Sequence, residues 1–369
     1  MKPSLAAFAV FLFAFPLFSQ EEEKKPVSLE ADFFYGNILE HNPAIQHLIT
    51  GHPTGFILSY NRKTYGFNEW ERRYNYPDWG FSMTYQNLHN EYLGDALGVY
   101  GHINWYFLNR NLRLQVGEGI AYMFKPYDTD SNYYNNAYGS HLVSSTFIKG
   151  SFIRENLWKG LGFNVGLAFI HYSNGNLKAP NTSTNTIALN AGINYLLDYK
   201  EFPEYIDKED SLSSSYAQKI AYNLEFRAGI NESDVIGSGQ EPFYEVSFYA
   251  DKRLNYKSTI QVGAEVFFST FLKEVIKFRS IAYPEDGLTG KEDYKRVGVF
   301  VGHELRFNKV AAITQLGYYV YWPYEFENRI YVRLGLKRYF SDDRFFATAS
   351  VHSHWAKAEA VEFGLGVRL

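Results

Sequence analysis

Strict alternation of apolar with polar or glycine residues is the feature that most limits what this chain can fold into. In the final segment, 361–369, every second residue is apolar, and the residues between are glycine or charged. Side chains two apart on a strand point to the same face of a sheet. Many such segments recur, joined by turns, with no helical segment long enough to cover their apolar faces, so lipid is the better cover. The sequence therefore predicts an all-β fold, a transmembrane antiparallel β-barrel of the outer membrane.

Sixteen segments show strand character. They are 28–37, 55–66, 79–88, 95–106, 111–123, 141–152, 161–173, 184–197, 220–230, 241–250, 255–268, 297–307, 309–321, 329–339, 344–353 and 359–369. Single-chain bacterial barrels prefer even strand numbers, so we expect one barrel of about 14–16 strands over residues 20–369. Short turns alternate with long loops, which places the long loops outside the cell. The long segment 198–219 falls on the short-turn side, and this alternation does not explain it.

The N-terminus predicts export. Lys2 is the only charge in residues 1–19, which contain an apolar run from Ala6 to Phe18, so we expect a cleaved signal peptide there. The absence of cysteine excludes disulfides. An aromatic content of 18% suits the aromatic girdles of a membrane barrel. A sequence pI of about 6.2 and the lack of a basic block argue against a nucleic-acid partner.

The stretch "HYSNGNLKAPNTSTN", 171–185, carries the candidate chemistry. His171 and Ser173 continue the parity of one apolar stripe, and Asn185 has the parity of the stripe on the next segment. We expect these stripes to face lipid and to bind acyl chains; they are Phe163, Leu167 and Phe169, and Ile187 and Leu189. A histidine can deprotonate a nearby serine when a third group fixes its tautomer, and Asn185 can supply that group. Gly175 and Asn181, in the loop between, are candidate oxyanion donors.

Two interpretations from different classes remain at this point. The first is an esterase on the outer wall of the barrel. The second is a passive pore or structural barrel, because a polar cluster is ordinary where a strand leaves the bilayer, and sixteen strands are enough for a water-filled lumen.

The stretch "HYSNGNLKAPN" resembles the active-site segment of the outer-membrane lipid A 3-O-deacylases. The segments "HNPAIQHLITGHPTG", "KPYD", "NNAYGSHL" and "HSHWAKAEAVEFGLG" resemble the longer acyloxyacyl hydrolase relatives of the Bacteroidetes group. This resemblance implies a carboxylic ester hydrolase that removes an ester-linked acyl chain from lipid A, its lipopolysaccharide partner in the outer leaflet. It implies His171 as base, Ser173 as nucleophile and Asn181 as oxyanion donor, with no cofactor and no metal. Asn185 stands where the smaller deacylases have a glutamate.

The triad composition also resembles outer membrane phospholipase A, which has an asparagine at the same spacing from its histidine. In that family a loop serine helps to bind calcium, and the corresponding residue here is Asn181. A phospholipase A-like enzyme is therefore the alternative activity, and calcium is expected only under that alternative. The deacylase interpretation explains more of the chain.

Other polar residues have simpler interpretations. We expect His141 to be a structural hydrogen bonder, and Asp128 and Asp130 to be solvated. His352 and His354 share one parity, so both rings could point at a single metal, but the sequence nearby offers no clear third ligand beyond the distant Glu359. With Trp355 beside them, we expect the two histidines to be anchors at the membrane interface.

Overall fold

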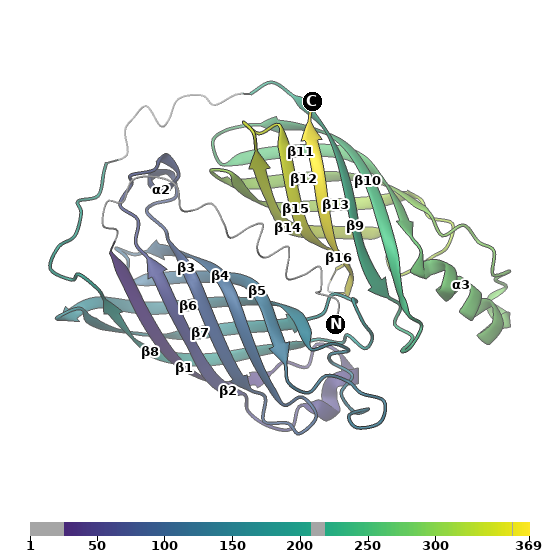
Figure 1. Cartoon of the computed structure of the whole chain (residues 1–369), viewed down its shortest axis with the longest axis horizontal. Helices are drawn as coiled ribbons and strands as arrows, with labels where there is room; N and C mark the ends of the chain where they lie inside the picture. The colour runs from purple at the N-terminus through teal and green to yellow at the C-terminus, as the bar shows by residue number, and fades with distance from the viewer. Residues whose placement is uncertain (1–25, 208–217, 356) are drawn as a thin grey trace. The chain divides into compact units, whose positions relative to one another are not determined.

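The computed structural model describes residues 26–207, 218–355 and 357–369. Their strands pair antiparallel into two closed barrels of eight strands each, drawn in purple to teal and in green to yellow (Figure 1). Within these residues, no helix is long and apolar enough to cross a membrane. The expected signal peptide, 1–19, lies outside the described residues.

The first barrel closes by pairing its first strand with its eighth. Eleven residue pairs join β1 to β8, from Ser28 opposite Leu196 to Ile38 opposite Thr186. A 3-10 helix, η1 (Pro43–Leu48), and a short helix, α2 (Glu69–Arg73), lie in its connections. Its strands are β1 (Val27–Ile38), β2 (Thr54–Arg62), β3 (Asp78–Asn87), β4 (Asp95–Phe107), β5 (Leu112–Met123), β6 (Leu142–Trp158), β7 (Leu161–Ser173) and β8 (Thr184–Leu196).

The second barrel closes in the same way, through β9 and β16. Its longest connection carries α3 (Phe271–Ala282) and η3 (Pro284–Asp286), and α3 buries Leu272 and Ile276 in a small apolar cluster with Tyr324. Its strands are β9 (Ala221–Glu232), β10 (Gln240–Arg253), β11 (Ser258–Ser269), β12 (Arg296–Phe307), β13 (Val310–Tyr321), β14 (Ile330–Phe340), β15 (Phe345–His354) and β16 (Lys357–Arg368).

All sixteen predicted strands are present, but the expected single barrel is corrected to two. Alternation within a strand shows which face is apolar and does not show which strand closes the sheet. Because β8 pairs with β1 and not with β9, the wall is complete after eight strands. After an even number of antiparallel strands, the chain is back at the end of the barrel where its first strand began. The connection between the barrels must therefore leave from the end that carries the short turns. This accounts for the position of segment 198–219, of which 208–217 lie outside the described residues.

The walls follow the predicted alternation. In β1, for example, burial alternates along the whole strand, with Phe33 and Tyr35 exposed and Asp32 and Phe34 buried. An apolar exterior and a polar interior are the pattern of a transmembrane barrel.

Both interiors are filled by side chains. In the first barrel, Arg113 donates to Glu30 over 2.5 and 2.7 Å, and Lys149 donates to Asp32 over 2.6 Å. An eight-stranded barrel has an interior just wide enough for side chains to fill. The pore interpretation assumed one wall of sixteen strands, and the closed eight-stranded walls remove that basis.

Candidate active site on the outer wall of the first barrel

Two adjacent strands, β7 and β8, position the residues of the candidate site. Along β7 the odd-numbered side chains face outward, whereas Ile170 and Tyr172 are fully buried in the interior. His171 and Ser173 share the outward parity of β7; His171 is half-buried, and Ser173 is buried at the end of the strand. The register places His171 directly opposite Asn185 on β8.

The His171 imidazole is oriented by the Asn185 amide. Its Nδ1 lies 2.6 Å from the Asn185 Oδ1. An amide oxygen only accepts, so Nδ1 carries the proton and Nε2 carries the lone pair. This tautomer suits a general base whose Nε2 must take a proton from a hydroxyl.

Ser173 lies at the end of β7, covered by the loop that follows it. The Asn181 Nδ2 donates to the Ser173 Oγ over 3.1 Å, while the Asn181 Oδ1 accepts from the backbone N–H of Asn174 over 2.9 Å. The loop therefore holds an amide N–H group beside the candidate nucleophile. Gly175, the other expected oxyanion donor, has a positive φ of 61° that favours glycine.

The expected acyl-binding stripes lie on β7 and β8, on the side of the candidate site away from the loop that joins these strands. Phe163, Leu167, Ile187 and Leu189 are exposed, Phe169 is half-buried, and Leu167 is paired with Leu189 across the two strands. These side chains form a continuous apolar surface that ends at the polar cluster.

Three outward-facing polar residues beside this cluster were missed by the sequence analysis. Glu118 of β5 accepts hydrogen bonds from the hydroxyls of Ser144 and Thr146 of β6. Ser144 is opposite Ser173, and Thr146 is opposite His171. The sequence does show that Glu118 interrupts a stripe of outward-facing apolar residues on β5. It does not show that β5 and β6 lie beside the candidate site.

Two of the secondary candidates have structural contacts. His141 stacks on Tyr122, and its Nδ1 lies 2.8 Å from the backbone oxygen of Met123, which fits a structural role. Asp128 accepts hydrogen bonds from the backbone N–H groups of Asp130 and Ser131 within its own turn.

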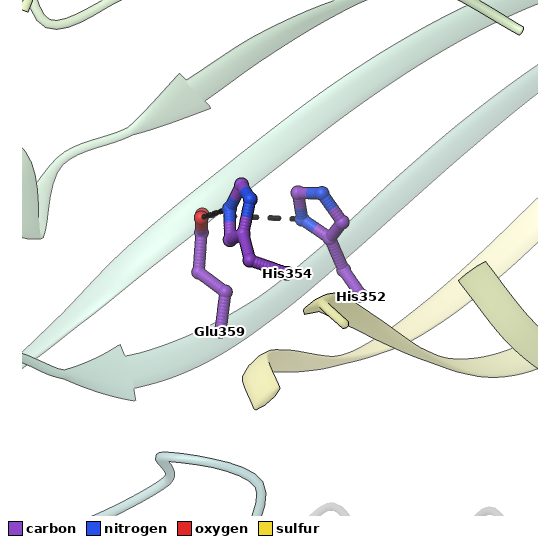
Figure 2. Close-up of side chains that lie close together, drawn as sticks. All are labelled: His352, His354 and Glu359. Atoms are coloured by element: carbon purple, nitrogen blue, oxygen red, sulfur yellow. Dashed lines mark hydrogen bonds and ion pairs between the residues drawn. The ribbon is translucent and has the colours of Figure 1, made fainter. Parts of the chain in front are cut away.

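The expectation of interfacial anchoring for His352 and His354 is wrong. The even-numbered residues of β15 face the interior, so both rings are buried in the second barrel beside Glu359 of β16 (Figure 2). The His354 Nε2 lies 2.9 Å from the Glu359 Oε2, and the His352 Nδ1 lies 3.9 Å from Oε1.

These three residues have the spacing of a metal site, but their charges are already balanced. Each residue offers one possible ligand atom, a ring nitrogen or a carboxylate oxygen, and these atoms lie within 4.8 Å of one another. However, Arg296 also binds both Glu359 oxygens, with its Nη1 2.8 Å from Oε2. A cation would have to compete with a buried guanidinium for this carboxylate, so we assign the cluster a structural role.

Comparison with known proteins assigns both barrels. The family model "Lipid A 3-O-deacylase (PagL)" matches residues 54–194, which span β2 to β8. The model "Acyloxyacyl hydrolase, C-terminal domain" matches residues 220–369, which span β9 to β16. Residues 54–194 belong to the first family, and residues 220–369 belong to the second. No curated protein matches the chain.

Among solved structures, the outer membrane enzyme PagL is 19% identical; the match covers 44% of this chain and 97% of that one, with a TM-score of 0.32. A mutant porin of Rh. blastica is 10% identical and covers 93% of this chain and all of its own, with a TM-score of 0.20. The family matches divide at the boundary between the two barrels, and the PagL match contains the whole His171–Asn185 stretch.

Proposed function

We propose that this PagL-family protein is an outer-membrane serine esterase that removes an ester-linked acyl chain from lipid A. The observation that carries the proposal is the geometry on the outer wall: His171 bonded through Nδ1 to Asn185, with Ser173 two residues away beside the Asn181 amide. Membership of the lipid A 3-O-deacylase family supports the reaction class.

The expected chemistry follows from the tautomer. The His171 Nε2 takes the Ser173 proton as Oγ attacks the ester carbonyl, and the carbonyl oxygen becomes an oxyanion stabilised by the Asn181 N–H. The intermediate collapses when the ester C–O bond breaks and His171 protonates the departing alcohol oxygen of lipid A. Water, deprotonated by His171, then attacks the acyl-serine and releases the fatty acid.

The place of the site suits a lipid already in the membrane. Acyl chains can lie along the apolar stripes of β7 and β8 without leaving the hydrocarbon, which leaves the ester at the rim beside Ser173. The connections at this end of the barrel face the exterior if the N-terminus is periplasmic, and lipid A occupies the exterior leaflet.

The test is mass spectrometry of lipid A from cells that express the full chain. Wild-type protein is expected to remove one ester-linked acyl chain, and Ser173→Ala is expected to leave the lipid A unchanged. The matched control is Ser140→Ala, which removes a hydroxyl at the same end of the barrel that donates to the backbone oxygen of Leu142 over 2.9 Å.

Phospholipids are analysed in the same samples, with and without a chelator. An unchanged lipid A profile with folded wild-type protein would contradict the proposal. Accumulation of Ser173-dependent lysophospholipid in place of deacylated lipid A would move the assignment to a phospholipase A-like enzyme.

A further inference from the structure

A carboxylate faces the membrane beside the candidate site. Glu118 lies on the outward parity of β5, among Leu114, Val116, Ile120 and Tyr122, and it is exposed on the wall. Ionisable side chains on the lipid face of a barrel are unfavourable, so where one occurs a function is the first interpretation.

Glu118 is connected to the site by the strand between them. Its Oε1 accepts from the Ser144 Oγ over 3.1 Å, and its Oε2 accepts from the Thr146 Oγ1. Across β6, Thr146 is opposite His171, and Ser144 is opposite Ser173. The four residues Glu118, Thr146, His171 and Asn185 thus form one row across β5 to β8 on the outer wall.

The row has an electrostatic consequence. Proton transfer from Ser173 makes His171 an imidazolium, and the neutral Asn185 can orient that ring but cannot balance its charge. Two strand spacings, about 10 Å, separate the backbones of β5 and β7, and charges at such a distance interact appreciably where water is scarce. Each hydroxyl has one proton, which it donates in the hydrogen bond to Glu118. The Thr146 oxygen therefore keeps its lone pairs free of that proton.

We propose that Glu118 is a positioning residue for the proposed esterase, supplying the negative charge that Asn185 lacks. Its carboxylate, held by the Thr146 and Ser144 hydroxyls of β6, stabilises the His171 imidazolium from β5. The inference rests on the proposed function. His41 also acts electrostatically on His171, and its Nε2 lies 2.9 Å from the backbone oxygen of Thr182 and 3.2 Å from the Ser183 Oγ.

The decisive variant is Glu118→Gln, because glutamine keeps an oxygen that can accept from the hydroxyls and removes only the charge. In full-length protein acting on purified lipid A, kcat is expected to fall about tenfold with KM unchanged. Without the carboxylate His171 loses its proton more readily, so the acid limb of the pH–rate profile is expected to move to lower pH.

The rescue variant is Glu118→Gln combined with Asn185→Glu, which moves the carboxylate to the position that bonds Nδ1. It is expected to recover most of the lost rate. The control is Asp95→Asn, an outward-facing carboxylate on β4 that bonds the Tyr85 hydroxyl over 2.6 Å and lies three strands from β7. It is expected to leave kcat and the pH profile unchanged.

Three outcomes separate the claims. Glu118→Gln with wild-type kcat and an unchanged acid limb would overturn the inference, and so would a loss of rate that Asn185→Glu does not restore. Activity in Ser173→Ala would instead overturn the proposed function. If Glu118→Gln does not fold, as judged by heat-dependent mobility in gels, Glu118→Asp replaces it. That variant is expected to keep the position of the acid limb, and a shift would count against the proposal.

Discussion

At the residue scale, the candidate site depends on single side chains whose position is set by parity and register. His171 and Ser173 face the same side because they are two apart, and Asn185 reaches His171 because the β7–β8 register places it directly opposite. A bond of 2.6 Å from Nδ1 fixes the ring in one tautomer.

Removing the orienting amide tests this reading of the site. Asn185→Ala is expected to lower kcat on lipid A by about 10²-fold with little change in KM, because the ring loses its preferred tautomer and orientation. Asn185→Asp, which keeps an acceptor at the same position, is expected to retain most of the activity. Steady-state kinetics in mixed micelles would measure both, and equal rates for Asn185→Ala and wild type would exclude an orienting role.

At the element scale, each strand carries an apolar face outward and a polar face into a closed interior. The second barrel shows how far the interior relies on charge. Arg333 of β14 donates to Glu362, Glu245 and Glu265, with distances of 2.7 Å to the first two. Removing one member of a buried network is costly because its partners keep their charges.

The Arg333→Met variant is therefore expected to lower the free energy of unfolding by about 3–5 kcal/mol. Arg279→Ala, which breaks the exposed pair with Asp286 on the connection after β11, is expected to cost at most about 1 kcal/mol. Urea titrations of protein folded into lipid vesicles would measure both. Similar midpoints for the two variants would show that the network does not stabilise the barrel.

At the scale of the whole molecule, two barrels each complete their own wall. Among the described residues, every strand of the first barrel pairs within residues 27–196, so these strand pairings need no strand from the second barrel. The first barrel also contains every residue assigned to the proposed chemistry.

We therefore predict that residues 20–207, exported alone behind a signal peptide, assemble into a barrel with heat-dependent mobility in gels. Lipid A from these cells is expected to lose the same acyl chain as with the full protein, and Ser173→Ala is expected to prevent this loss. If the fragment assembled but left lipid A intact, the second barrel would be required for activity.

Strand positions, face parity and the candidate His171–Ser173–Asn185 cluster could all be predicted from the sequence, because they depend on the local period of two. Asn185 could be predicted as a partner of His171 because it lies on the next strand along the chain, which one loop joins to β7.

Sequence alone could not reveal which strands close a wall, or which side chains meet across strands distant in the chain. Glu118 accepts hydrogen bonds from two residues that lie 26 and 28 positions later in the chain. Arg296 and Glu359 are hydrogen-bonded although 63 positions separate them in the sequence. Alternation fixes the face of a side chain, whereas its neighbours on that face depend on register and closure, which are properties of the whole sheet. For that reason the sequence by itself determined the strands of a membrane barrel and predicted a candidate site on their outward face. Only the tertiary structure decided that there are two barrels and that a carboxylate lies beside the candidate site.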